Sequence, residues 1–416
     1  MSVPTTPDRE PLVLAVNAGS SSLKFGLYAA QGPARLVGQC SGLEPGGTPR
    51  WQTDAEPAAP LPLAAGQTPW DAALGALLAL LHRTHVGERE AGAPGSAGAG
   101  ALLAVAHRIV HGGSVCTAPV LLDEAHLAAL AELSPLAPLH QPHNLAGVAA
   151  FRRALPSVPQ VGCFDTAFHA TLPPLERRLP LPGALDAQGL RRYGFHGLSY
   201  QYLSETLAAR TPRSQGRALL MHLGSGASLC ATLQGRSVAT TMGFSALDGL
   251  MMGTRCGSLD PGVLLHLWRA GRTLDEVEAL LYRDSGLKGV SGRSADLRTL
   301  RALVAAGGDG AADAALAIDL FTHRIVREAG ALVALMGGVD LVAFTGGIGE
   351  HDAALRAGLA QRLGFLGLRI DAARNHAATG EAIAPVHAGD STAELWVVPT
   401  DEGRVAARSA FSLLRA

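Results

Sequence analysis

Two stretches of this chain, half a chain length apart, show the same pattern of apolar runs around a small polar turn. LAVNAGSSSLKFGLY runs from Leu14 to Tyr28, and LLMHLGSGASLCATL occupies 219–233, with Gly19 aligned to Gly224 at an offset of 205 positions. An apolar run, a Gly/Ser turn and a second apolar run predict a β-hairpin. A repeat at half the chain length predicts two similar domains.

The rest of the chain alternates apolar runs with amphipathic segments. Strands are predicted in ALLAVAHRIVHGG, VPQVGCFDTAFH, VDLVAFTGG and AELWVVPT. Helices are predicted at 68–85, in DEAHLAALAEL, and at 144–154, 262–270, 273–283, 311–336, 350–362 and from about 402. Residues 43–67 and 87–100, rich in Pro, Gly and Ala, are expected to form a surface excursion and a flexible loop. The pattern predicts an α/β protein whose last helix returns to the first domain.

Composition excludes several classes of function. The 416 residues carry 34 basic and 35 acidic side chains, and a net charge of −1 gives no case for binding nucleic acid or an anionic membrane. The N-terminus lacks the regions of a signal peptide. The most apolar stretch, ALVALMGGVDLVAF, is broken by glycines and Asp340, so no membrane-spanning helix is expected. Five cysteines without a CxxC pair indicate reduced thiols in a cytosolic protein.

The first Gly/Ser turn is a candidate phosphate site, because such turns offer backbone N–H groups and hydroxyls to a polyphosphate. The P-loop spacing G-x-x-x-x-G-K-[ST] is absent, and a strand follows where a helix would be required. We interpret the turn as a phosphate hairpin of the type found in sugar kinases, heat-shock ATPases and actin. Lys24, one of two lysines in the chain, is either a phosphate ligand or a solvated strand residue.

The strand HRIVHGG contains two histidines and an arginine. His107 and His111 at i, i+4 would form a metal pair on a helix, but on a strand they share one face with Ile109, which favours a structural role. Arg108 lies on the other face. It needs an anion, because a guanidinium in a buried strand is almost always paired.

Four further motifs carry polar groups. Asp165 stands at the C-terminal end of a strand, where open α/β sheets bind ligands, although a cap or turn aspartate is an equal alternative. His196 lies between aromatic and glycine residues in RRYGFHG. Arg255 lies in the glycine-rich loop GLMMGTRCGSLDP, a kind of loop that is seldom merely structural. Asp296 and Arg298 follow a turn in GVSGRSADLR.

Two motifs near the C-terminus complete the set. FTGGIGEH lacks the third glycine of a dinucleotide fingerprint, but its strand-to-helix glycines would let a nucleoside lie against the backbone. In PTDEG, Asp401 and Glu402 open the last helix. They are either ordinary N-terminal helix acids or hold a magnesium ion through water.

Together these strings resemble the acetate kinase (acetokinase) family over nearly the whole chain. Ten motifs occur in the family's order: NAGSSSLKF, HRIVHGG, PLHQPHN, FDTAFH, RRYGFHG, HLGSGAS, MGTRCGSLDP, SGRSADLR, FTGGIGE and PTDE. The resemblance implies an α/β fold of two actin-like (ribonuclease H-like) domains with a nucleotide cleft between them. Residues 1–165 with about 399–416 would form the first domain, and 166–398 the second, with the nucleotide pocket and dimer interface.

The resemblance also implies an activity. The family transfers the γ-phosphoryl group of ATP to acetate, reversibly and in line, giving acetyl phosphate and ADP. The expected protein is a cytoplasmic homodimer that uses Mg²⁺ or Mn²⁺ and binds neither nucleic acid nor membrane. A propionate or butyrate kinase is the near alternative. A nucleotide-gated binding ATPase of the heat-shock type is the alternative from another class, although it would normally carry an added peptide-binding domain.

The resemblance assigns roles to matching positions. Arg108 and Arg255 would hold the carboxylate and the phosphoryl group, and His196 would donate to the transition state. Asp165 would position the carboxylate or help to hold metal, since acetate is already ionised and hardly needs a base. The acetate would contact Arg108, Val110, Leu139, Phe195 and Ala246, and the last four would surround its acyl tail. The nucleotide and its phosphates would contact Asn17, Ser20, Ser22, Lys24, His222, Gly224, Ser225, Gly226, Asp296, Arg298, Gly346, Gly347, Ile348 and Gly349. The metal would be held by Asn17 and Glu402, and His140 would lie near His196.

The chain also departs from the family's usual residues. It has Ser225 for Asn, Ala246 for Pro, Asp248 for Glu, Cys256 and Ser258 for Ser and Asp, His351 for Asn, and Gly403 for Glu. These departures bear on nucleotide affinity, the surroundings of the metal and the preferred acyl chain.

Overall fold

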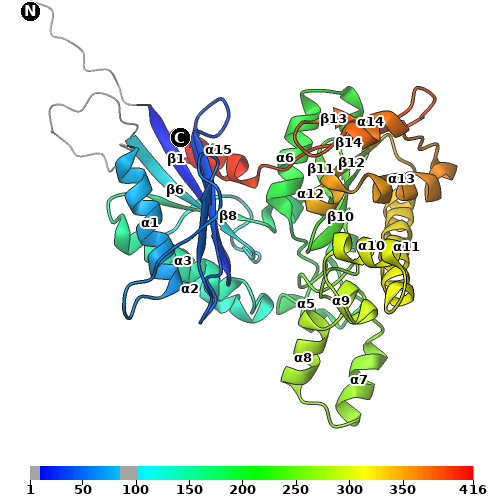
Figure 1. The fold of residues 1–416 in the computed structure, drawn as a ribbon, viewed down its shortest axis with the longest axis horizontal. Coiled ribbons are helices and arrows are strands. Elements are labelled where there is room, and N and C mark those ends of the chain that lie inside the picture. The colour runs from blue at the N-terminus through cyan, green and yellow to red at the C-terminus, as the bar shows by residue number, and fades with distance from the viewer. Residues whose placement is uncertain (1–9, 85–100, 416) are drawn as a thin grey trace, which may run out of the picture. The chain divides into compact units, whose positions relative to one another are not determined.

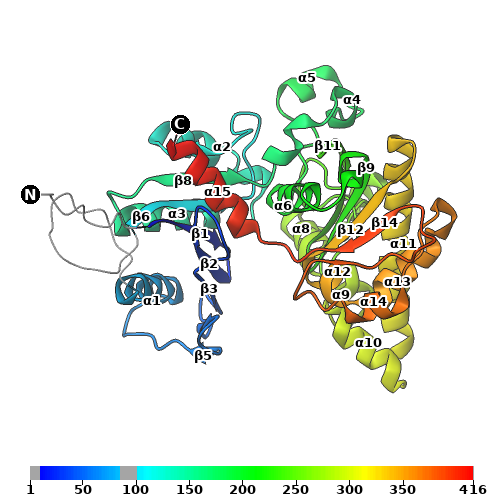
Figure 2. The same ribbon diagram turned by 90° about the horizontal axis from the view of Figure 1, so that it is seen from above.

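The computed structural model describes residues 10–84 and 101–415. The chain divides into two compact units, one formed by residues up to Ala167 together with Asp401–Ala416, and the other by Phe168–Thr400. We call them unit 1 and unit 2. The loop predicted at 87–100 lies outside the described residues. Each unit is built on a sheet of its own (Figures 1 and 2).

Unit 1 contains an eight-stranded sheet in the order β5-β4-β3-β2-β1-β6-β8-β7. The strands are β1 Pro11–Ala18, β2 Ser22–Ala29, β3 Leu36–Ser41, β4 Arg50–Thr53, β5 Ala59–Pro60, β6 Ala101–Ile109, β7 Val120–Leu121 and β8 Gln160–Phe164. Strands β1 to β5 pair antiparallel, whereas β6 runs parallel to both β1 and β8. The C-terminal ends of β1, β6 and β8 therefore meet at one edge of the sheet.

Unit 2 contains a six-stranded sheet in the order β11-β10-β9-β12-β14-β13. The strands are β9 Arg217–Leu223, β10 Ala227–Leu233, β11 Arg236–Thr240, β12 Leu341–Thr345, β13 Ala384–Pro385 and β14 Glu394–Val397. Its antiparallel meander β11-β10-β9 is followed by the parallel strands β12 and β14. Strands β3-β2-β1-β6-β8 have the same pattern, so the predicted α/β fold is confirmed and the two hairpins occupy equivalent places.

Helices cover both sheets. Those of unit 1 are α1 Pro69–Arg83, α2 Glu124–Glu132, α3 Gln141–Ala154 and α15 Glu402–Arg415. Figure 1 shows α15, in red, beside β1, β6 and β8, on which it packs. Since α3 also packs on β1 and β6, the interior of β1 is buried on both faces, which explains its continuous apolar run.

Unit 2 holds the remaining helices of the described residues. They are α4 Pro174–Arg177, α5 Gly183–Ala187, α6 Gly197–Ala208, α7 Pro261–Arg269, α8 Leu274–Arg283, α9 Gly286–Ser291, α10 Leu297–Ala306, α11 Ala311–Met336, α12 Gly346–His351, α13 Ala353–Arg362 and α14 Ala372–Ala377. The long helix α11 packs on β9, β10 and β11 through buried residues that include Phe321 and Ile325. Within residues 10–84 and 101–415, none of the helices combines the length and apolar character needed to cross a membrane.

Three predictions of local structure are wrong. The excursion at 43–67 contains β4 and β5, and Trp51 of β4 is buried against Phe25 with ring centroids 5.0 Å apart. Helix α3 begins at Gln141, three positions before the start predicted at 144. The helix expected at 350–362 is two helices, α12 and α13, with a break at Asp352, which caps α13 by accepting a hydrogen bond from Leu355 N.

Candidate functional site

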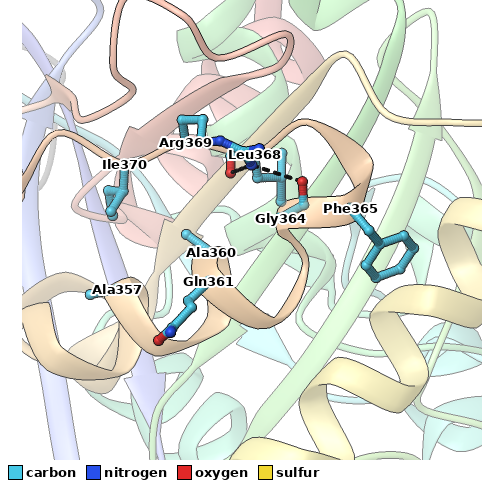
Figure 3. Close-up of a pocket in the computed structure, with 8 residues that line it drawn as sticks. All are labelled: Ala357, Ala360, Gln361, Gly364, Phe365, Leu368, Arg369 and Ile370. Carbon is cyan, nitrogen blue, oxygen red and sulfur yellow. Dashed lines mark hydrogen bonds between the residues drawn. The ribbon is translucent and has the colours of Figure 1, made fainter.

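A hollow of about 530 Å³ lies beside α13 and the segment after it. Figure 3 shows Arg369 of this hollow already donating to the carbonyls of Gly364 and Leu368. The lining is otherwise apolar apart from Gln361, and none of the predicted site residues belongs to it. The candidate site is therefore built from the two hairpins and the residues around them, described one unit at a time.

The turn of the first hairpin joins β1 and β2. Gly19 N donates to the carbonyl of Ser22 (2.8 Å), which closes the turn and leaves Ser20 exposed. Asn17 and Lys24 are cross-strand partners, so their side chains lie on the same face of the sheet. Lys24 is exposed there, on the face opposite to the buried Leu23 and Phe25.

Arg108 and Asp165 meet because β6 and β8 are parallel neighbours. Arg108 is in register with Cys163, and Asp165, two positions further, projects from the same face. The contact is bidentate: Arg108 Nη2 lies 2.6 Å from Asp165 Oδ2, and Arg108 Nε lies 2.9 Å from Oδ1. Glu402 adds a second carboxylate, with Oε2 at 3.4 Å from Arg108 Nε. We call these three residues the ion-pair cluster.

In the ion-pair cluster, two carboxylates balance the positive charge of Arg108. Burial alone lowers the pKa of Arg108, but the charges of Asp165 and Glu402 and the hydrogen bond to Asp165 together raise it well above its ordinary value. The Asp165 side chain is only 2% exposed, so its ion pair with Arg108 is largely shielded from water. The anion that the sequence analysis required for Arg108 is thus supplied by unit 1 itself.

Two residues of the QPHN segment hold this edge of the sheet, and the sequence analysis assigned them no role. Asn144 accepts a hydrogen bond from Val110 N (3.0 Å) and donates to the Ala18 carbonyl (2.7 Å). It thereby links the end of β6 to the end of β1, beside the first turn. Gln141 pairs with both backbone groups of His111. The available signal was the pair of amide side chains in QPHN, at the start of a helix.

Asp401 and Glu402, at the start of α15, have different contacts. Asp401 accepts hydrogen bonds from Arg404 N and from the hydroxyl of Tyr28 (2.7 Å), so it takes the ordinary capping role. Glu402 takes the role in the ion-pair cluster. A Cβ atom at Gly403 would lie 2.5 Å from the Tyr28 hydroxyl, so Tyr28 fills the space that the family's usual glutamate would need.

The second hairpin turn lies among three cationic or titratable side chains. A Cβ atom at Gly226 would lie 2.8 Å from Arg255 Nη2 and 3.3 Å from His196 Nε2, so both atoms border the same glycine. The rings of His196 and His222 stack with centroids 4.1 Å apart. A Cβ atom at Gly224 would lie 3.9 Å from His222 Nε2 and 3.8 Å from Gly347 N. We call His196, His222 and Arg255, with this turn, the imidazole cluster.

Buried contacts hold the backbone at His196, which has φ 59° and caps α6 in the left-handed region. The preceding residue, Phe195, is buried, and its carbonyl accepts a hydrogen bond from His169 Nε2 (2.9 Å). His169 Nδ1 lies 2.8 Å from Ser237 Oγ. Burial lowers the pKa of His169 to about 4, so the ring is a neutral structural link.

Arg255 is held by its own loop. Its Nη1 donates to the Ala246 carbonyl (2.5 Å), and burial lowers its pKa. Among the residues that the structure describes, no carboxylate forms an ion pair with it. The loop itself docks on the second turn, since Gly253 N donates to the Ser225 carbonyl (3.1 Å). A desolvated guanidinium without a carboxylate is suited to an anionic ligand.

The residues predicted to bind adenosine fall in two places. Asp296 caps α10 and forms an ion pair with Arg298, whose side chain is 90% exposed. The hydrogen bond from Arg298 is the main cause that lowers the pKa of Asp296 to about 2. Gly346 begins α12 with φ 76°, and a Cβ atom there would lie 2.7 Å from the Leu223 carbonyl, so this turn requires glycine. Gly347, Ile348 and Gly349 continue α12, with Gly347 exposed.

Two charged residues that the sequence analysis did not single out brace the glycine turn. Glu350 Oε1 accepts hydrogen bonds from Gly346 N (2.8 Å) and Thr400 N (3.2 Å). Arg356 is fully buried and donates to the carbonyls of Gly349 and Glu350, which end α12. The signal for Arg356 was an arginine at a core-facing helical position.

The remaining predicted contacts are apolar or lie on short segments. Val110 is buried directly after β6, and Leu139 and His140 are half-buried directly before α3. His107 is buried and lies 2.7 Å from Gln160 Oε1, which agrees with a structural role. In the part of the chain that the structure describes, no three His, Cys, Asp or Glu side chains gather as a ligand set for a metal.

Comparisons with known proteins agree on one family. The family model described as the acetokinase family matches residues 12–408. An acetate kinase from Rhodopseudomonas palustris is 43% identical over 411 residues, which cover 97% of this chain and 98% of the relative. Two solved structures are similar over 97% of this chain and 100% of their own: a propionate kinase from Francisella tularensis (30% identity, TM-score 0.86) and an acetate kinase from Porphyromonas gingivalis (33% identity, TM-score 0.83).

Proposed function

Because the chain belongs to the acetokinase family, we propose that it transfers the γ-phosphoryl group of ATP to acetate. One acetate oxygen bonds to the γ-phosphorus while the bond to the β–γ bridging oxygen breaks, and ADP leaves. Acetate is already ionised near neutral pH, so no proton has to be removed. The heat-shock alternative has no support from the family match.

One observation carries the proposal: the half-buried Arg255 and the Nε2 atom of His196 border the same glycine of the second turn. Phosphoryl transfer needs in-line positioning and positive charge around the moving group. A guanidinium without a carboxylate partner, imidazole N–H groups and turn amides supply both. In this proposal Arg108 orients the acetate carboxylate, and Asp165 fixes Arg108. The turn at Gly346–Gly349 takes the adenosine.

The metal is proposed to be Mg²⁺. Glu402, Asp165 and Asn17 offer hard oxygen donors of the kind that Mg²⁺ prefers, and Glu402 is bound to Arg108 through a single contact of 3.4 Å. When bound, Mg²⁺ would neutralise charge on the ATP phosphates. Few protein ligands are needed, because Mg²⁺ in such enzymes keeps several waters and binds substrate phosphates.

Assembly and location are also proposals. Helix α7 has no buried residue, and its exposed apolar side chains include Leu265 and Trp268, three positions apart on one face of the helix. We propose that this face forms a homodimer, because exposed apolar surface marks interaction sites. A cytoplasmic location fits the five free cysteines. Light scattering should give twice the chain mass, and Trp268→Glu should give the chain mass.

The test of function is ADP release with hydroxylamine trapping of the acyl phosphate. Acetate, propionate and butyrate are compared at equal concentration with MgATP. We expect an acyl hydroxamate from acetate, a smaller yield from propionate and little from butyrate. ADP release without any hydroxamate would reject the proposal. The assay also decides for this chain between acetate, used by the R. palustris relative, and propionate, used by the F. tularensis structure.

A further inference from the structure

Two hydroxyl groups lie behind His196, on the side away from the second turn. Ser228 Oγ is 2.8 Å from His196 Nδ1, and the Tyr200 hydroxyl is 2.5 Å from the same Ser228 Oγ. Tyr200 lies in the first turn of α6, which His196 caps, and Ser228 is the second residue of β10. Both are fully buried. The geometry points to a positioning relay, Tyr200–Ser228–His196, that fixes which ring nitrogen of His196 carries the proton.

The direction of the relay follows from the tyrosine. Burial raises the pKa of Tyr200 well above its ordinary value, so the phenol stays protonated. A buried hydroxyl donates its hydrogen where it can, and the side chain bonded to this hydroxyl is Ser228. Tyr200 therefore donates to Ser228, and the single hydrogen of Ser228 is left for His196 Nδ1.

The consequence for His196 is one tautomer. If Nδ1 accepts the hydrogen of Ser228, the ring proton of the neutral imidazole is on Nε2. Nε2 is the atom that borders Gly226 and Arg255. A hydrogen-bond donor is thus held ready beside the second turn, before any ligand arrives, and the stacked ring of His222 keeps the plane of His196 fixed.

A second series of hydrogen bonds holds the imidazole of His222. Thr400 Oγ1 donates to Ser199 Oγ (3.2 Å), and Ser199 Oγ lies 2.9 Å from His222 Nδ1. Ser199 and Tyr200 are adjacent in α6, so one helical turn supplies a hydroxyl group to each of the two series of hydrogen bonds. The two histidines are therefore oriented by the same element. Tyr200 and Ser228 are positioning residues, because they act through His196.

This inference rests on the proposed function for its kinetic part only. In Ser228→Ala, kcat should fall by about 10- to 100-fold, the usual range for a lost orienting partner of a functional imidazole. The KM values for ATP and acetate should change less than about threefold, since the donor acts mainly in the transition state. Tyr200→Phe keeps the ring that packs edge-on against His169 and should lower kcat by about 10-fold.

The double variant separates a relay from two independent structural effects. Groups that act as one unit are not additive, so Tyr200→Phe with Ser228→Ala should be no slower than Ser228→Ala alone. Multiplied losses would overturn the relay. Tyr202→Phe and Ser204→Ala, on the same helix, are the matched controls and should leave kcat and thermal stability unchanged.

A spectroscopic measurement tests the tautomer without any turnover. Nitrogen-15 NMR of the full-length wild-type protein, with His196 assigned through His196→Gln, should show a protonated Nε2 and an unprotonated Nδ1. In Ser228→Ala the His196 signals should shift toward a mixture of tautomers. A protonated Nδ1 in the wild type would overturn the inference even in an active enzyme. A wild-type protein with the expected tautomer but no acyl phosphate formation would instead reject the proposed function.

Discussion

The ion-pair cluster of unit 1 and the imidazole cluster of unit 2 both centre on an arginine, yet they treat its charge in opposite ways. Arg108 is bonded to the carboxylates of Asp165 and Glu402. Arg255 is bonded to a neutral carbonyl, that of Ala246, and burial lowers its pKa. The positive charge of Arg108 is balanced by carboxylates of unit 1. The positive charge of Arg255 is balanced by no carboxylate among the described residues and is therefore suited to an anionic ligand.

This difference means that the two arginines contribute differently to the stability of the protein. The contacts of Arg108 fix its orientation and make it part of the stability of unit 1, because Asp165 is buried beneath it. The orientation of Arg255 comes from loop backbone, so its loss leaves no buried carboxylate behind. Stability and activity should therefore respond differently to the same substitution in the two clusters.

The largest expected effect is on stability. Arg108→Met would remove the positive charge beside the buried carboxylate of Asp165 and should reduce the free energy of unfolding by about 3–5 kcal/mol. Arg255→Met should change it by about 1 kcal/mol or less, since only a hydrogen bond to a carbonyl is lost. Denaturant unfolding of both variants measures this. Equal losses would mean that the two arginines are held alike.

The second prediction concerns activity, in which the two arginines should be equal. Arg108→Lys and Arg255→Lys should each lower kcat/KM by a factor of at least ~10², or about 3 kcal/mol. A planar fork bridges carboxylate and phosphoryl oxygens, whereas an ammonium group cannot. Steady-state kinetics with acetate and MgATP provide the measurement. Near-normal values for either lysine variant would remove that arginine from the site.

The third prediction uses one buried histidine from each unit. Burial lowers the pKa of His107 and of His169 from 6.5 to about 4. A lowered folded-state pKa gives stability that is present above pH 6.5 and lost as the pH falls toward 4, by up to about 3 kcal/mol for each residue. Melting curves from pH 7.5 to 4.5 should show this loss. His107→Gln or His169→Gln should make the stability less dependent on pH, and an unchanged slope in both would contradict the prediction.

The smallest effect is expected at Ala246, which connects the imidazole cluster to acyl selectivity. Its carbonyl holds Arg255, and proline would keep that carbonyl while adding ring atoms to the side chain. If the side chain borders the acyl tail, Ala246→Pro should lower the propionate/acetate ratio of kcat/KM several-fold, about the 0.8 kcal/mol of one buried methylene. An unchanged ratio would show that Ala246 serves only through its carbonyl.

The periodic elements were predictable, and the short or composition-biased ones were not. Both hairpins and α11 were placed from apolar pattern alone, because the hairpin strands form continuous buried runs and α11 buries a regular stripe. Strands β4 and β5 were missed because they are short strands in a Pro- and Gly-rich segment. They form only by pairing, β4 on β3 and β5 on β4 at the edge of the sheet. The start of α3 was missed although a proline in its first turn is a recognised helix-start signal.

The sequence by itself determined the repeated hairpin, the α/β class and the residue types of the site, because each is written in local spacing and in the ten ordered motifs. Only the tertiary structure decided which side chains meet. Arg108 and Asp165 are 57 positions apart and pair because β6 and β8 are parallel neighbours in one register. His196 and Ser228 meet because α6 packs on β9, which pairs with β10 in the second hairpin. Local patterns encode elements, whereas the order of strands in a sheet follows from how the whole core packs.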